Sequence, residues 1–98
     1  MILVTAKIRC LPGAEDDFIA AATACTVPTL AEAGCLSYVC LRDVGDPLAF
    51  MFVEEWEDRE SLGAHARSAH LGEFQSAVKS LLESQSVTLH TVEKSRTL

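Results

Sequence analysis

The chain has 98 residues, which suffice for one domain but not for two independent hydrophobic cores, so we expect a single domain over residues 1–98. Its eight Lys and Arg stand against fourteen Asp and Glu, and the net charge of -6 repels a phosphate backbone and argues against nucleic-acid binding. No stretch approaches the roughly 20 apolar residues of a membrane span, and the first residues lack a basic leader with a cleavage site, so we expect a cytoplasmic protein that does not bind membranes.

The first predicted element is a strand over residues 2–11, in which the side chains alternate between two different faces. Pro12 and Gly13 end this strand. Three acidic residues then fall in the first turn of a predicted helix, where the helix dipole favours negative charge, and apolar residues follow at helical spacing. Pro28 lacks the amide hydrogen that a helix interior needs, so we expect the helix to end and restart there. Gly34 is suited to a left-handed cap that closes the segment.

Two strands are predicted in the middle of the chain, over residues 35–44 and 48–57. The tripeptide Gly45-Asp46-Pro47 between them has the composition of a tight turn. We therefore expect these strands to form an antiparallel hairpin.

The last third of the chain is predicted to hold two helices and a strand. Asp58 is a suitable cap for a short helix, and Ser68 for a second one, which the spacing of apolar residues extends to about Glu83. Alternation over residues 87–93 predicts a fourth strand. The order is that of an α+β, ferredoxin-like βαββαβ fold, with an antiparallel four-stranded sheet that carries its helices on one face. Because the other face would be bare, and 49% of the residues are hydrophobic, we expect a second copy to cover it.

Four cysteines are present, and without a secretory signal we expect them to be reduced and buried. No two of them form a Cys-x-x-Cys pair, and none has a His at zinc-ligand spacing. The sequence therefore predicts no metal site.

Several segments of the chain carry a family resemblance: KIRCLPGAEDDF at 7–18, EAGCLSY at 32–38, VEEWED at 53–58 and HARSAHLGEF at 65–74. Together they resemble the antibiotic biosynthesis monooxygenase-like (ABM) family, of the quinol monooxygenase type. The resemblance implies a homodimer in which two sheets form a dimeric α+β barrel, with a ligand cavity between the sheet and the helices of each protomer. Haem-degrading members carry an Asn on the first strand and a His on the last long helix, where this chain has Ala6 and Gln75, so we expect no haem and no other cofactor.

Two histidines are the candidate catalytic residues. His65 follows Leu62 on the inward-looking stripe of the short helix, and an imidazole exchanges protons near neutral pH, so His65 is the first candidate for a general base. His70 begins the next helix and is expected to assist or to shape the same cavity. The alternative is that both side chains are structural.

A second group of candidates should line the substrate cavity. Glu54 and Trp56 share one face of the third strand, and Phe52 lies on the same face. Trp56 can stack on an aromatic substrate or fill the core, and a carboxylate at Glu54 is costly among aromatic rings unless it is hydrogen-bonded or functional. Tyr38 can donate a hydrogen bond to a ligand oxygen or fill the sheet, and Phe74 should line the apolar wall.

The leading interpretation is a cofactor-independent monooxygenase that acts on a small aromatic substrate, a quinol or related electron-rich phenol, and on dioxygen. His65 would remove a proton, and the resulting phenolate can pass one electron to dioxygen. One alternative is an isomerase of a small hydroxyketone, which would need a cation from Arg42, Arg59 or Arg67 if its substrate is phosphorylated. The other is a non-catalytic dimeric ligand-binding or stress-related module.

Overall fold

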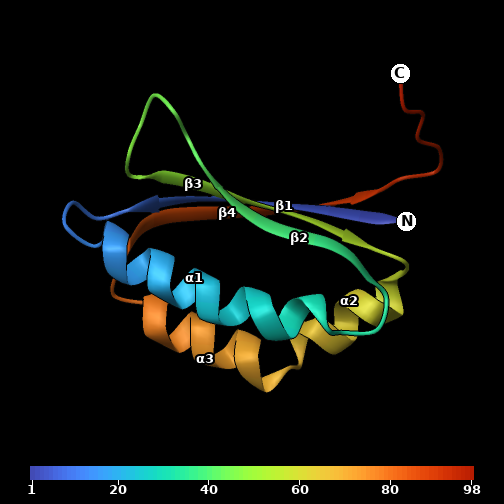
Figure 1. The fold of residues 1–98 in the computed structure, drawn as a ribbon, viewed down its shortest axis with the longest axis horizontal. Coiled ribbons are helices and arrows are strands. Elements are labelled where there is room, and N and C mark those ends of the chain that lie inside the picture. The colour runs from blue at the N-terminus through green and yellow to red at the C-terminus, as the bar shows by residue number, and fades with distance from the viewer.

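All 98 residues are described in a computed structural model of the chain. The elements are, in order, β1 (Ile2–Cys10), α1 (Glu15–Leu30), β2 (Cys35–Arg42), β3 (Ala49–Trp56), α2 (Arg59–Ala66), α3 (Ala69–Val78) and β4 (Leu82–Thr91). The predicted βαββαβ order with a split second helical region is therefore confirmed. Figure 1 shows that the three helices lie against one face of the sheet and that the opposite face carries none. None of these helices has the length and apolar character that crossing a bilayer requires.

The sheet is antiparallel with the strand order β2-β3-β1-β4, so the two inner strands supply most of the core. The alternation predicted for β1 is confirmed, because Ile2 and every second residue up to Cys10 are buried under the helices. The register aligns Tyr38, Glu54 and Val4 in one row across the sheet. These side chains therefore form a continuous floor beneath the helices.

Helix α1 runs without a break from Glu15 to Leu30, so the restart expected at Pro28 is wrong. Pro28 falls in the last turn, where its missing amide hydrogen removes one hydrogen bond and does not interrupt a long ladder. The buried Thr29 beside it donates its hydroxyl to the carbonyl of Cys25 at 2.7 Å, which reinforces the same turn. Packing of this turn on the sheet outweighs the local cost of the proline.

The helix predicted to reach about Glu83 is shorter than expected. Helix α3 ends at Val78, a turn follows, and β4 already begins at Leu82. Leu81 accepts a hydrogen bond from the amide of Leu11 at 2.9 Å, and its side chain packs on the core from the turn. Its apolar character therefore reflects burial rather than a helical face.

The predicted helix caps are confirmed. The Asp58 carboxylate accepts the amide hydrogen of Ser61 at 2.8 Å, and the Ser68 hydroxyl oxygen accepts that of Leu71 at 3.3 Å. These caps fix the start of α2 and of α3, the two helices that carry the histidines. The four cysteines are free thiols; Cys10 and Cys25 are buried, and the other two are half-buried.

Gly34 brings the end of α1 onto α2. It adopts the predicted left-handed conformation, with φ of +80°, three residues beyond the helix cap at Ala31. A Cβ added at Gly34 would overlap the Oγ of Ser61 and lie 2.5 Å from its Cβ. The absence of a side chain therefore allows the loop that contains Glu32 to approach the helix that contains His65.

We expect Gly34→Ala to lower the free energy of unfolding by about 3 kcal/mol, from the left-handed backbone and from the clash with Ser61 together. Gly13→Ala is the matched control, because Gly13 has φ of +88° and no atom within 4 Å of an added Cβ. The control should lose only about 1–2 kcal/mol. Urea unfolding of both variants measures the difference, and equal losses would contradict the close approach at Gly34.

Candidate active site

A cavity of about 190 Å³ lies between the helix-facing side of the sheet and helices α2 and α3. Five of the seven predicted site residues line it: Tyr38, Phe52, Glu54, His65 and Phe74. The wall is otherwise mainly aliphatic, with Gln75 and Gln85 at one side. The cavity is thus apolar with a few polar groups, which is the usual character of a small-molecule site.

The aromatic wall of the cavity is made by two phenylalanines and a tyrosine. The rings of Phe52 and Phe74 meet edge to face, with centroids 5.5 Å apart, and the Tyr38 ring lies 5.5 Å from Phe52. Burial raises the pKa of the Tyr38 hydroxyl, so it stays protonated and can donate a hydrogen bond. Within the protein that hydroxyl has only a weak contact, to the sulfur of Cys25 at 4.0 Å.

Trp56 is fully buried and does not line the cavity. Its indole nitrogen donates to the Glu54 carboxylate at 3.0 Å, and its ring packs on the His65 ring with centroids 4.8 Å apart. The indole therefore orients two cavity groups from behind, and this placement favours the core-filling alternative over direct stacking on a substrate.

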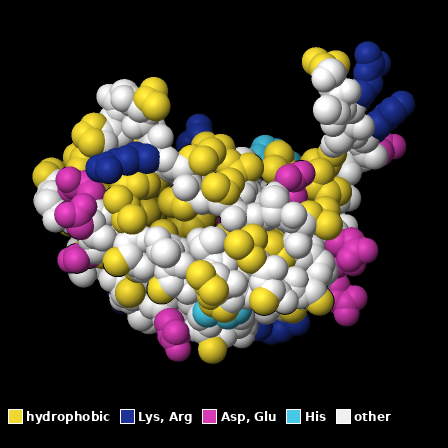
Figure 2. Space-filling view, viewed as in Figure 1, with side chains coloured by type: hydrophobic (Ala, Val, Ile, Leu, Met, Phe, Trp, Pro, Cys, Tyr) yellow, Lys and Arg dark blue, Asp and Glu magenta, His cyan; other side chains and the backbone are white.

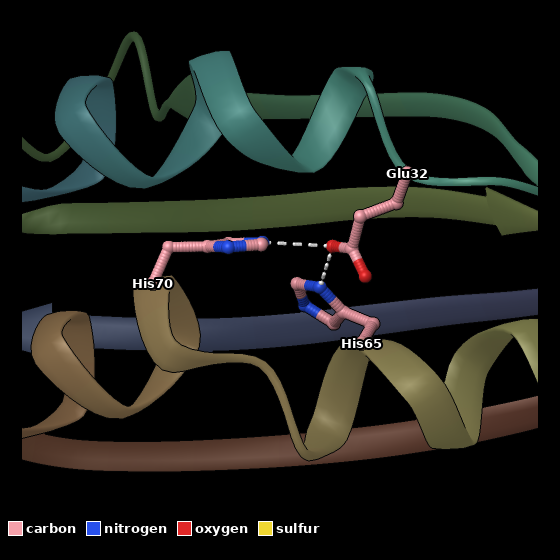
Figure 3. Close-up of side chains that lie close together, drawn as sticks. All are labelled: Glu32, His65 and His70. Atoms are coloured by element: carbon pink, nitrogen blue, oxygen red, sulfur yellow. Dashed lines mark hydrogen bonds and ion pairs between the residues drawn. The ribbon is translucent and has the colours of Figure 1, made fainter.

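His65 and His70 meet at one carboxylate, that of Glu32 (Figure 3). Nδ1 of His65 lies 2.6 Å from Glu32 Oε2, and Nε2 of His70 lies 2.9 Å from the same oxygen. Because an ionised carboxylate can only accept, both ring nitrogens carry the hydrogen in this arrangement. Glu32 comes from the loop after α1, His65 from the last turn of α2 and His70 from the first turn of α3.

The contact with Glu32 determines which nitrogen of His65 can act as a base. With the hydrogen on Nδ1, Nε2 keeps its lone pair. Nε2 has no hydrogen-bond partner in the protein. It is not fully buried, because every fully buried side-chain nitrogen and oxygen atom has such a partner, and the ring lines the cavity. The negative charge of Glu32 would also stabilise the imidazolium that forms when Nε2 takes a proton.

Glu54 supplies the carboxyl group that lines this cavity, and it is 7% exposed. Burial raises its pKa, while the hydrogen bond from Trp56 acts in the opposite direction. A group that binds its proton more tightly when folded costs stability once the pH exceeds the ordinary carboxyl range.

Glu54→Gln is therefore expected to stabilise the protein at pH 7, by on the order of 1 kcal/mol, since the amide oxygen still accepts from Trp56 and no charge is buried. The gain should shrink toward about pH 3.5, where the wild-type carboxyl group is protonated in both states. Urea unfolding at the two pH values measures it. Glu57→Gln, at an exposed position, should show no such pH-dependent gain, and a gain that is constant with pH would contradict the buried charge.

Glu32 was not among the predicted site residues, although it lies in the segment EAGCLSY. No local pattern distinguishes it from other loop carboxylates, because its partners lie 33 and 38 residues further along the chain. It reaches them only through the packing of α1 beside α3 (Figure 1). The absence of any other acidic residue in the loop between Leu30 and Cys35 was the one available signal.

A larger recess, of about 420 Å³, lies between α1 and β2. Figure 2 shows it as a hollow lined by hydrophobic side chains, with a basic side chain across its rim. Its lining contains no histidine and no carboxylate, and its one cation, Arg42, donates to the carbonyl of Pro47 at 2.7 Å. Of these two hollows, only the smaller one is lined by a histidine and a carboxylate, and Arg42, Arg59 and Arg67 do not line it.

Comparison with known proteins points to one family and to several solved structures. The family described as "Antibiotic biosynthesis monooxygenase" matches residues 1–77. YcnE of Bacillus subtilis strain 168, a proposed monooxygenase, is 29% identical over 82 residues, which are 84% of this chain and 86% of YcnE. The crystal structure of PA3566 from Pseudomonas aeruginosa has a TM-score of 0.88 and 27% identity, covering 95% of this chain and 94% of that one. A structure from Deinococcus radiodurans has a TM-score of 0.93 at 17% identity, covering 100% and 98%, and shows the shared fold alone.

Proposed function

Because the chain belongs to the antibiotic biosynthesis monooxygenase family, we propose that it is a cofactor-independent monooxygenase that oxidises a small quinol or related electron-rich phenol with dioxygen. The observation that carries this proposal is the His65 ring, which is held by Glu32 through Nδ1 and lines an apolar cavity. At about 190 Å³ the cavity is smaller than the roughly 300–1,000 Å³ of sites for drug-sized ligands. A substrate of one or two rings fits this size.

The proposed reaction begins with a proton transfer. The substrate hydroxyl gives its proton to Nε2 of His65, and Glu32 stabilises the imidazolium. The phenolate passes one electron to dioxygen, and the phenoxyl radical and superoxide combine to form a carbon–oxygen bond. The imidazolium of His65 returns the proton to the peroxide, which then loses water as the C–H bond at the oxygenated carbon breaks. One oxygen atom enters the ring, the other leaves as water, and the ring is oxidised to the quinone.

The remaining cavity residues would bind and orient the substrate. Phe52 and Phe74 offer apolar ring faces and edges, and the Tyr38 hydroxyl can donate to the substrate oxygen as charge develops on it. The largely aliphatic wall limits the water around the phenolate, which strengthens these interactions. Such a site needs orientation and a base more than it needs a bound redox group.

The isomerase alternative has weaker support. A phosphorylated hydroxyketone needs a convergent Lys or Arg, and neither residue type lines this cavity. For the same reason an uncharged aromatic substrate fits the cavity better than an anionic one.

We also propose that the protein is a homodimer, with the bare sheet face of each protomer packed on the other. Val39 and Leu41 of β2 lie on that face and are 41% and 50% exposed. They pair with Val53 and Met51 of β3, so the apolar side chains are contiguous. An apolar patch on a sheet that has helices on its other side is typical of a protein interface.

Oxygen uptake tests the enzymatic proposal. The purified protein, checked for flavin and haem by absorbance and for metals by elemental analysis, would be mixed with a panel of one- and two-ring hydroquinols in an oxygen-electrode cell. We expect substrate-dependent uptake that added catalase does not reverse, because water rather than hydrogen peroxide is formed. Rates equal to the protein-free background for the whole panel would overturn the proposal. A parallel isomerisation assay with a phosphorylated hydroxyketone addresses the alternative.

A further inference from the structure

We propose that Glu32, His65 and His70 form a binding site for a divalent transition-metal ion of the Zn²⁺ class, and that an ion bound there prevents His65 from acting as a base. The binding itself is independent of the function proposed above, whereas the loss of the base rests on it. The sequence predicts no metal site because its Cys and His residues do not stand at the short spacing of common zinc ligands, whereas these three ligands come from three separate segments.

The donor set is suited to such an ion. Glu32 Oε2, His65 Nδ1 and His70 Nε2 all lie within 4.8 Å of one another. Two imidazoles and one carboxylate are a known set of protein ligands for zinc, with a fourth position left for water. With metal–ligand bonds of about 2.0–2.1 Å, tetrahedral ligand atoms stand about 3.4 Å apart. Nδ1 of His65 and Oε2 of Glu32 are 2.6 Å apart, so they need to separate by less than about 1 Å to bind the same ion.

An ion can reach this cluster from solvent past His70 and Glu32. The His70 side chain is 22% exposed and that of Glu32 is 15%, while His65 behind them is 4% exposed. His70 also borders a recess of about 160 Å³ between α1 and α3, whose lining contains Glu73 but no Lys or Arg. The recess beside His70 is thus acidic, and His70 is the most exposed of the three ligands.

An ion at this site would invert the tautomer of His65. In the metal-free protein Nδ1 donates its hydrogen to Glu32, and Nε2 keeps the lone pair that accepts the substrate proton. A metal ion takes the lone pair of Nδ1, so the hydrogen moves to Nε2 of the same ring. No proton is gained or lost by the ring, and Zn²⁺ is not reduced. With Nε2 protonated and Nδ1 bound to the ion, His65 can donate but cannot take a proton from a phenol.

Calorimetric titration with Zn²⁺ alone, followed by Co²⁺ absorption spectroscopy, tests the binding. We expect one ion per chain and a Co²⁺ spectrum without a thiolate charge-transfer band. Glu32→Gln and His70→Gln should each weaken binding by at least about tenfold. Their matched controls are Glu60→Gln, at an exposed position in the first turn of α2, and His90→Gln, at an exposed position on β4; both should bind as the wild type does.

Circular dichroism and thermal unfolding would show whether each variant is folded. If Glu32→Gln does not fold, His70→Gln decides the question, because His70 is only half-buried. Equal weakening in the control variants, unchanged binding in both ligand variants, or a thiolate band would overturn the site. For the base, oxygen uptake should fall as Zn²⁺ saturates the protein, and the inhibitory concentration for His70→Gln should rise by the same factor as its dissociation constant. Zn²⁺ binding that leaves oxygen uptake unchanged would contradict the proposal that the ion prevents His65 from acting as a base. An absence of uptake before any Zn²⁺ is added would contradict the proposed function but not the metal site.

Discussion

Replacing His65 by Asn is expected to lower the rate of substrate-dependent oxygen uptake by about 10²–10⁴-fold, the usual contribution of a general base. Asn is the informative replacement, because its side-chain amide can still donate to Glu32 from near the Nδ1 position while Nε2 is removed. The loss should fall mainly on kcat, since the aromatic wall that binds the substrate is unchanged. Steady-state uptake measured against substrate concentration separates kcat from KM.

The control for this variant is His90→Asn, which removes an exposed imidazole that does not line the cavity. It should keep the wild-type rate. Imidazole added to the buffer should partly restore the rate of His65→Asn, since the missing Nε2 leaves space beside the substrate. A His65→Asn enzyme with an unchanged kcat would show that another group removes the proton and would eliminate the proposed role of His65.

Features of the fold that depend on local rules are evident from the sequence. Alternation in β1 predicts which side chains face the helices, and Asp58 and Ser68 cap helices because their side chains reach amides three residues away. Gly34 adopts φ of +80°, as its position after a helix indicates. Each of these outcomes is decided within one turn of the chain, where sequence spacing and spatial proximity coincide.

Other features could not be predicted, because distant segments decide them. Local stereochemistry predicts a helix break at Pro28, but packing of the last turn on the sheet keeps α1 continuous. Leu81 continues the apolar spacing of a helix, yet it lies in a turn and packs against the core while its carbonyl accepts from Leu11. The one local signal for Glu32 is that no other acidic residue lies in its loop, and its contacts follow only from the meeting of α1 with α2 and α3.

The residues of the candidate site likewise fall into those that a local rule predicts and those that distant packing decides. Glu54 and Phe52 line the cavity of about 190 Å³, because the period of two places them on the helix-facing side of β3. The same rule does not distinguish a side chain that lines a cavity from one that is sealed behind it. Trp56, two residues further, is fully buried and supports His65 from behind. The rule gives the face of the sheet, and the helices above it decide which residues stay accessible.

Val53→Asp is expected to convert the proposed homodimer into monomers. Val53 lies on the bare face of the sheet between Thr5 of β1 and Val39 of β2, so its side chain would be central to a face-to-face interface. Each protomer would bring one unpaired carboxylate into that interface, at a cost of about 4 kcal/mol or more, which raises the dissociation constant about 10³-fold. Light scattering on a size-exclusion column measures the mass.

The matched control is Val27→Asp, because Val27 lies on α1, is 70% exposed, and belongs to the helical side of the sheet. The same substitution there should leave the mass at that of two chains. Circular dichroism distinguishes a folded Val53→Asp monomer from an unfolded chain, since only the folded monomer keeps the wild-type spectrum. A wild-type protein that elutes with the mass of one chain at micromolar concentration would contradict the proposed homodimer. In that event another binding partner would have to cover the apolar side chains of Val39 and Leu41, because an apolar sheet face of this kind is rarely left exposed to water.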